Sequence, residues 1–385
     1  MARLSLSLTG PLPRNEELVA ATRELDRGRR TAEEVRSLYD RATREVVELE
    51  TSREFAAVTG GFLEWADLFR PFTQRIPGLR AGPLTRWFET NTFFRRPIFT
   101  EPPVSDGGVL ADALPLDILR ESPLPRKVLL PGPYTLSGLA ENETDLSRGD
   151  LARAWAGVLA REVSALARWG YTHVQIQEPL LVVDPPSLEK ENEVVAAYAP
   201  LASALEGVQS LVWTFYGDAA PVLPLLAKLP VQGFGIDLSE TDPARIRAFP
   251  PGRVLGLGCL DSRTSLPEDP LEIARLVREL EGRLHPAGIH LGASAPLDLL
   301  PWETAKAKLE VLVAARRILA STGPSAHASS RAPSRRRVRA PTPPARARRR
   351  AARTPRRAPS TSRSRHGTRA SRPTPRHRTS RRRVS

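Results

Sequence analysis

The chain has 385 residues, of which 41% are hydrophobic, and a formal net charge of +14. This length suits one large α/β barrel or two smaller domains, and the single cysteine, Cys259, excludes an intrachain disulfide. No run of roughly 18 uncharged apolar residues occurs, and the opening segment 1–9 lacks the continuous apolar core of a signal peptide, so we expect a soluble, cytoplasmic protein with no membrane segment.

The positive charge lies at the carboxyl end. Residues 321–385 contain 21 arginines and no lysine, aspartate or glutamate, so residues 1–320 alone are net negative. A segment rich in Arg, Pro, Ala, Ser and Thr lacks the apolar side chains that offset the entropy of ordering, and we expect it to be disordered. Three explanations stay open: GC-rich DNA translated in a shifted frame, an incidental disordered tail, or an arm that binds nucleic acid through phosphate contacts.

The body, residues 1–320, alternates short apolar runs with helical patterns. The runs predicted as strands are Leu4–Leu8, Phe55–Thr59, Lys127–Pro131, Thr172–Gln177, Leu211–Phe215, Gly233–Leu238, Val254–Leu260 and Ile289–Ser294. The predicted helices are Asn15–Asp26, Ala32–Leu49, Ser147–Trp169, Pro270–Leu284 and Trp302–Ala320. Strands that alternate with helices are buried on both faces of a parallel sheet, so the pattern predicts an α/β fold: one closed (β/α)8 barrel with a helical elaboration near the amino end.

Polar residues at strand ends are the candidates for a site, because α/β barrels place their sites at the carboxyl ends of the strands. Glu178 directly follows a predicted strand, where its carboxylate can hold an ammonium group or act as an acid or base. Asp237 and Asp261 end two later strands, and the three together predict an acidic cup for an amino-acid or pterin-like ligand. For each of them, a helix cap, a loop anchor or an ion pair with Arg is the structural alternative.

Arginines and the residue types that bind metals are the other candidates for a site. Arg14, Arg86 and Arg263 are candidate partners for a ligand carboxylate, with ion pairs to barrel carboxylates as the alternative. The three histidines of the body show no metal-ligand spacing, and one cysteine cannot build a thiolate site. The sequence therefore predicts no metal site, and it contains no phosphate-binding loop or dinucleotide fingerprint.

Seven motifs, in this order, resemble the cobalamin-independent methionine synthase family. They are Gly10–Arg14, Thr85–Asn91 with Arg96-Pro97 after it, Gly132–Thr135, Gln175–Pro179, Leu229–Asp237, Leu257–Arg263 and Ala305–Leu309, and the similarity covers about residues 5–318. The resemblance implies a (β/α)8 barrel enzyme that transfers the methyl group of a methylated folate to the thiolate of homocysteine, held on zinc.

The same resemblance implies zinc ligands that this chain lacks. Thr214-Phe-Tyr216 stands where a His-x-Cys pair is expected, Asp237 is nearest to the expected Glu, and Ser294 or Ala295 replaces the second Cys. Thr214–Asp218 instead resembles the non-catalytic amino-terminal half of the duplicated members, and Gln177 replaces an Asp that contacts substrate. We therefore expect no zinc, and we expect substrate contacts from Arg14, Trp87, Asn91, Thr135, Gln177, Glu178, Tyr216, Asp237, Asp261 and Ser294.

Three functions follow as hypotheses. The barrel could transfer methyl groups without zinc, or with a partner protein that supplies the missing chemistry. It could be a catalytically silent barrel that binds a folate-like or amino-acid ligand. Nucleic-acid binding would rest on the basic tail alone.

Overall fold

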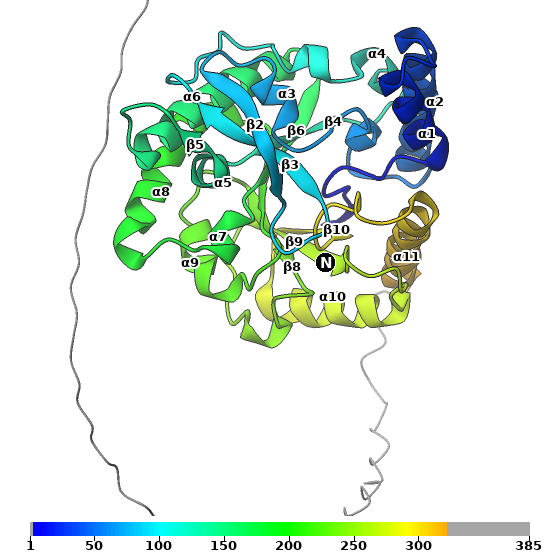
Figure 1. Ribbon diagram of the computed structural model, residues 1–385. Helices are drawn as coiled ribbons and strands as arrows, with labels where there is room; N and C mark the ends of the chain where they lie inside the picture. The colour runs from blue at the N-terminus through cyan, green and yellow to red at the C-terminus, as the bar shows by residue number, and fades with distance from the viewer. Residues whose placement is uncertain (1–2, 322–385) are drawn as a thin grey trace, which may run out of the picture. The chain divides into compact units, whose positions relative to one another are not determined.

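A parallel sheet rolled into a barrel forms the centre of the molecule (Figure 1). The computed structural model describes residues 3–321, so the predicted tail and its nucleic-acid hypothesis lie outside the described residues from 322 onward. Seven strands are hydrogen-bonded in the order β1-β10-β9-β8-β7-β6-β4. Their bounds are β1 Arg3–Leu6, β4 Arg126–Pro131, β6 Tyr171–Gln177, β7 Gln209–Trp213, β8 Gly233–Asp237, β9 Val254–Leu260 and β10 Gly288–Ala293.

The eighth position of the barrel is filled by a segment that pairs with its neighbours only briefly. Phe55 forms a parallel bridge with Leu6 of β1, and Val58 forms one with Arg126 of β4, which closes the circle. The prediction of a full strand at Phe55–Thr59 was wrong. The N–H groups of Thr59 and Gly60 donate instead to the buried carboxylate of Glu50, at 2.9 and 3.1 Å, and this turns the chain away from the ladder.

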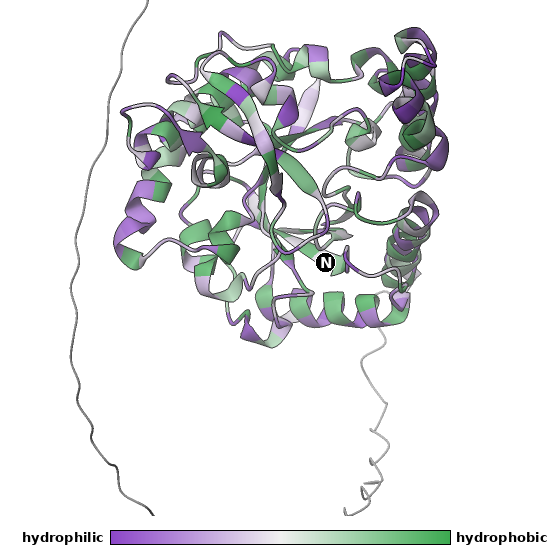
Figure 2. Cartoon of the chain, viewed as in Figure 1, coloured by the Kyte–Doolittle hydropathy of each residue, from purple (hydrophilic) through white to green (hydrophobic). Residues whose placement is uncertain are grey.

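Helices pack around the strands, and the two long helices near the amino end form the predicted helical elaboration. Their bounds are α1 Glu16–Asp26, α2 Ala32–Ser52, α3 Arg70–Thr73, α4 Leu116–Leu119, α5 Pro133–Leu139, α6 Arg148–Ala167, α7 Leu180–Val183, α8 Glu191–Tyr198, α9 Leu223–Leu226, α10 Pro270–Leu284 and α11 Trp302–Ser321. Local signals fix the long helices: Asn15 caps α1, Thr31 and Glu34 form a capping box on α2, and Ser147 caps α6. Hydrophobic and hydrophilic residues alternate along α10, as expected of a helix with one buried face (Figure 2). None of the helices within residues 3–321 is long and apolar enough to cross a membrane.

A second, smaller sheet was not predicted. Strands β2 Leu79–Arg86 and β3 Phe93–Phe99 form an antiparallel hairpin, and β5 Glu141–Asn142 pairs parallel with β3. The hairpin, drawn in cyan in Figure 1, ends in the Trp-Phe-Glu-Thr-Asn motif at residues 87–91. It therefore carries to the barrel a motif that the sequence alone could not place.

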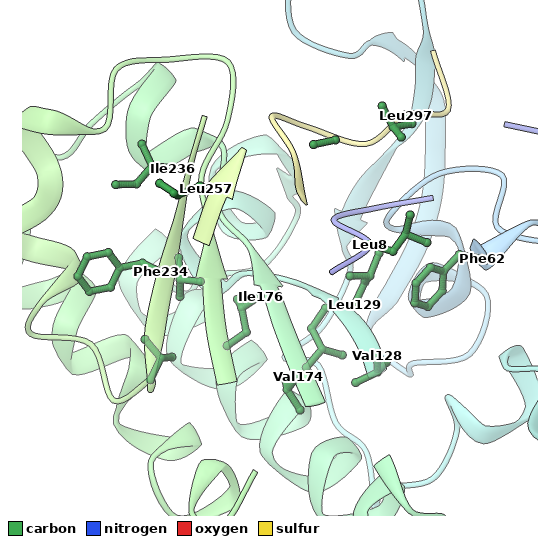
Figure 3. Close-up of a cluster of buried hydrophobic side chains, with 14 of the residues drawn as sticks. Leu8, Phe62, Val128, Leu129, Val174, Ile176, Phe234, Ile236, Leu257 and Leu297 are labelled. Carbon is green, nitrogen blue, oxygen red and sulfur yellow. The ribbon is translucent and has the colours of Figure 1, made fainter. Parts of the chain in front are cut away.

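The core combines aliphatic side chains from most strands with one large aromatic at the centre of the barrel. Figure 3 shows Val128 and Leu129 of β4 beside Val174 and Ile176 of β6. Trp213 of β7 is fully buried, and the glycines of the neighbouring strands make room for it. A Cβ at Gly235 would lie 2.1 Å from the Trp213 ring, so this position requires glycine.

Candidate functional site

A cavity of about 260 Å³ opens at the carboxyl ends of the barrel strands, between the barrel and the hairpin. It is lined by Pro11, Leu12, Pro13 and Arg14 after β1, by residues 63, 65–68 and 92–94, by Trp87, Gln177 and Phe215, and by Pro296 and Asp298 after β10. A larger hollow of about 680 Å³ contains Leu4 and Ile289, at the opposite ends of the strands. Because α/β barrels use the carboxyl-terminal face for ligands, the cavity at the strand ends is the candidate site.

A chain of buried hydrogen bonds leads through the barrel to this cavity. The Lys127 Nζ donates to Ser7 Oγ at 2.7 Å, to the Leu8 carbonyl at 2.6 Å and to Gln175 Oε1 at 2.6 Å. Burial lowers the pKa of Lys127 to about 7, and the charge of Glu50 opposes the shift. The network fixes Gln175 on β6, two residues before the cavity-lining Gln177.

Gln177 is held in one orientation by this network. Its Nε2 donates to the Thr9 carbonyl at 2.6 Å, and the same carbonyl accepts the Gln175 Nε2 at 2.7 Å. The side chain of Gln177 is buried, and its Oε1 has no donor among the described residues. A buried amide oxygen without a donor costs free energy, so Gln177 is held in this position at some expense to stability.

The side chain of Glu178, the next residue, does not line the cavity. Its carboxylate accepts hydrogen bonds from Tyr134 N at 3.0 Å, Thr135 N at 2.8 Å, Thr135 Oγ1 at 2.5 Å and Tyr198 OH at 2.6 Å. Burial raises the pKa of Glu178, and these four donors oppose the rise. Gly132 allows the close approach, because a Cβ there would lie 2.1 Å from the carboxyl carbon. The Gly-Pro-Tyr-Thr and Gln-Glu-Pro motifs are therefore two halves of one structural unit at the start of α5.

Asp237 and Ser294 join the loops around the barrel mouth. The Asp237 carboxylate accepts from Tyr216 N at 3.0 Å and from Ser239 N at 2.8 Å, and burial raises its pKa. The Ser294 Oγ accepts from Ser262 N at 3.1 Å. Both side chains thus have loop-anchoring partners, and for Asp237 this is the alternative that the sequence left open.

The hairpin tip is attached to the barrel by aromatic contacts. Phe88 contacts Tyr216 with ring centroids 5.7 Å apart, and both residues have positive φ, +46° and +69°. The guanidinium of Arg263 lies over the Tyr216 ring, 5.9 Å from its centroid. Burial raises the pKa of Tyr216, so its hydroxyl is neutral. The contact holds Trp87 against Phe94 at the edge of the cavity, with ring centroids 5.2 Å apart.

The structure brings three of the predicted site residues to the cavity: Arg14, Trp87 and Gln177. The others lie outside its lining: Asn91, Thr135, Glu178, Tyr216, Asp237, Asp261 and Ser294. Their roles in binding stay predictions. Sequence reasoning missed Phe215, Phe94 and Asp298. Asp298 follows the last strand by five residues, so the rule that selected the other strand-end residues could have found it. Phe94 had no such signal, because it reaches the cavity through the unpredicted hairpin.

The positions that would hold zinc in the resembled family do not fit that ion. Thr214 Oγ1 donates to the Gly235 carbonyl at 3.1 Å, and the carboxylate of Asp237 is occupied by backbone N–H groups. Neither Tyr216 nor Ser294 supplies the imidazole or thiolate that zinc prefers. Between residues 3 and 321, no group of three or more His, Cys, Asp or Glu side chains could hold a metal ion.

Comparison with known proteins finds relatives that agree with the family resemblance of the sequence motifs. A family model described as "Cobalamin-independent synthase, N-terminal domain" matches residues 68–285. The methionine synthase of Sulfurisphaera tokodaii is 26% identical over 329 residues, which cover 82% of this chain and 92% of that protein. The 5-methyltetrahydropteroyltriglutamate–homocysteine methyltransferase of a Synechococcus strain is 31% identical over 237 residues, 59% of this chain but only 30% of that protein.

The solved structures support the fold. A B12-independent methionine synthase from Shewanella sp. W3-18-1, in complex with selenomethionine, aligns with a TM-score of 0.68 at 19% identity, over 83% of this chain and 98% of that chain. A putative vitamin-B12-independent methionine synthase from Listeria monocytogenes aligns with a TM-score of 0.64 at 17% identity. At these identities the likeness shows a shared barrel fold and nothing further about ligands.

Proposed function

Because the chain belongs to the cobalamin-independent methionine synthase family, with its match in the N-terminal domain of that family, we propose that its barrel serves methyl transfer from a methylated folate to homocysteine or a related thiol. The observation that carries this proposal is the cavity at the carboxyl ends of the barrel strands, where enzymes of this architecture bind substrates. Its lining combines aromatic side chains with a cation, a carboxylate and an amide, which is the mixture that small-molecule sites use.

We infer that the thiol is activated elsewhere. A thiol is a weak nucleophile until it is deprotonated, and a metal or a nearby cation is the usual means. The four positions compared above with zinc ligands carry oxygen side chains, and those of Thr214, Asp237 and Ser294 are already hydrogen-bonded within the barrel. A partner protein that carries the missing ligands is therefore part of the proposal. In its favour, this chain spans only 30% of the Synechococcus relative, so that longer relative holds a large part that this chain does not match.

The exposed apolar side chains of the hairpin suit such a partner. Phe93, which lines the cavity, is 59% exposed, and Leu84 of the same hairpin is 62% exposed. Large apolar side chains that are exposed beside a site indicate a surface that another protein covers.

The test measures methionine formation from methylated triglutamyl folate and homocysteine. The full chain is assayed alone, with chelator, and mixed with the part of the Synechococcus relative that it does not match. We expect little product from either protein alone and a clear gain for the mixture. Turnover by the chain alone in chelator would remove the partner from the proposal. Binding of a substrate without turnover in any mixture would favour the silent binding barrel, and binding of neither substrate would reject both functions.

A further inference from the structure

The tip of the β2–β3 hairpin (Figure 1) forms one wall of the candidate cavity, through Trp87 and residues 92–94. We propose that this tip, residues 84–94, is a movable flap that rotates about a bulge in β2 and is held closed by Tyr216 of the barrel. Tyr216 is then a positioning residue for the cavity wall. The inference goes beyond the proposed function and does not rest on it, because the motion can be measured without any ligand.

A break in the pairing of the two strands separates the tip from the base of the hairpin. The register shifts between Ala81 and Leu84, where Gly82 and Pro83 have no partner in the ladder. A bulge of this kind bends the strand that carries it and interrupts the hydrogen bonds. The break therefore supplies a hinge between the base, which ends at Ala81, and the tip, which begins at Leu84.

The base of the hairpin is anchored to the rest of the molecule by polar contacts. Arg80 forms an ion pair with Glu143, and β3 pairs with β5. Arg96, opposite the break, donates from its Nε to the Leu139 carbonyl at 3.0 Å. These contacts fix the hairpin up to the hinge.

The tip has one polar contact with the barrel. Its other hydrogen bonds stay within the hairpin: Arg86 Nε donates to the Thr90 carbonyl at 2.6 Å, and Thr90 N donates to the Trp87 carbonyl at 3.1 Å. The contact with the barrel is the hydrogen bond between the indole of Trp87 and the hydroxyl of Tyr216. The tip can therefore move as a unit, since its internal hydrogen bonds move with it.

The apolar packing of the tip is uneven along its length. Phe94, near the hinge, is buried, and its ring centroid lies 5.4 Å from that of Phe69. Leu84 and Phe93 are more than half exposed. Because segments with few buried apolar contacts open locally at low cost in free energy, the packing fixes the hinge end and leaves the far end to its contact with Tyr216.

The contact that closes the flap is strained on both sides. Phe88 and Tyr216 meet with ring centroids 5.7 Å apart, and both residues have positive φ, +46° and +69°. A residue with a Cβ adopts this conformation at a cost in free energy that is comparable to the gain from one aromatic pair. Tyr216 is fixed to the barrel because its N–H donates to Asp237 at 3.0 Å, so Phe88 is the side that can relax by moving away.

Opening of the flap would uncover a small buried cluster. Trp213, Phe215 and Ala295 form this cluster, and Trp87 and Tyr216 pack against it. Ala295 is fully buried in the closed state. A reactive group at position 295 would therefore report each opening of the flap.

The test measures how fast a thiol beneath the flap is alkylated. Ala295→Cys is placed in a Cys259→Ala background, and the folded full chain is treated with iodoacetamide and followed by mass spectrometry. We expect alkylation at a rate that hardly changes at low urea, because a local opening exposes little new surface. A rate with the full urea dependence of global unfolding would overturn the proposal. Ser294→Cys, also buried, replaces Ala295→Cys if that variant does not fold.

Variants of the closing contact test the role of Tyr216. Tyr216→Leu should speed alkylation about tenfold, since the ring contact and the hydrogen bond to Trp87 are both lost. Phe88→Ala should speed it too, because the ring is lost and the strain is kept. Phe88→Gly should be alkylated more slowly than Phe88→Ala, since glycine adopts positive φ without strain.

Trp169→Ala serves as the matched control. Trp169 is 41% exposed and contacts Arg120 through its ring, and it precedes β6 at the end of the barrel opposite the cavity. This variant should leave the alkylation rate unchanged. Equal acceleration by Trp169→Ala and Tyr216→Leu would mean a general loss of stability and would overturn the flap, as would an unchanged rate in Tyr216→Leu.

Discussion

Glu178→Gln tests the structural role that the fold gives to this residue. The carboxylate is fully buried and accepts four hydrogen bonds, from two backbone N–H groups and from the hydroxyls of Thr135 and Tyr198. The amide of glutamine keeps one acceptor oxygen and turns an NH2 group toward the other donors. About two charge-assisted bonds are lost at ~1.5–3 kcal/mol each, less the smaller desolvation cost of a neutral amide, so we expect a loss of about 2–4 kcal/mol.

The assay is urea denaturation of the full chain, followed by circular dichroism. Tyr198→Phe removes one of the four donors at 2.6 Å and should cost about 1–2 kcal/mol, which gives an internal scale. The slope of the unfolding free energy against urea should stay constant, so that midpoint shifts report stability. If Glu178→Gln loses less stability than Tyr198→Phe while ligand binding weakens, the capping role is refuted and Glu178 returns to the substrate-binding group.

Two further predictions concern the barrel interior. Burial and the nearby Lys127 lower the pKa of His173 to about 4 and of His290 to about 3, so the folded state keeps both rings neutral. As the pH falls below about 6.5, the unfolded chain takes up these protons first, so the free energy of unfolding falls by about 2 kcal/mol per histidine at about pH 5. His290→Asn should therefore flatten the dependence of the urea midpoint on pH between about 4 and 6.5. An unchanged profile would contradict the assignment. Gly235→Ala should lower the free energy of unfolding by roughly 1–3 kcal/mol or more, because its Cβ would lie 2.1 Å from the Trp213 ring. Gly282→Ala lies in helix α10, where a Cβ would meet nothing within 4 Å. This variant should raise the melting temperature, through a gain in the free energy of unfolding of up to about 1 kcal/mol. Equal effects of the two glycine variants would mean that the ring does not require the space.

The helices were predictable because their signals are local. The start of α1 is set by Asn15, whose Oδ1 accepts from Leu18 N at 2.9 Å, and the end of α6 is followed by Gly170 with a φ of +79°. The strands of the barrel were found within two residues because a parallel strand buried on both faces leaves a continuous apolar run. The prediction of a full strand between β1 and β4 was wrong, because residues 55–58 pair with each of these neighbours through a single bridge and not through a ladder of hydrogen bonds.

The site was only partly predictable. The motif resemblance found Arg14, Trp87 and Gln177, all of which line the cavity. The direction of each side chain could not be read from the sequence. Glu178 follows Gln177 directly, yet their side chains serve different surroundings, because successive residues at a strand end point to opposite sides.

By itself, the sequence determined the periodic burial of the barrel, the helix caps and the motifs that mark the family, because these depend on residues close together in the chain. Only the tertiary structure decided which polar groups stay free. The N–H groups of Tyr134 and Thr135 reach the Glu178 carboxylate from 44 and 43 residues earlier, and the Thr9 carbonyl accepts Gln177 Nε2 across 168 residues. Whether a buried polar atom is satisfied depends on partners that folding brings from distant segments, so only the tertiary structure shows that Gln177 Oε1 has no donor within residues 3–321.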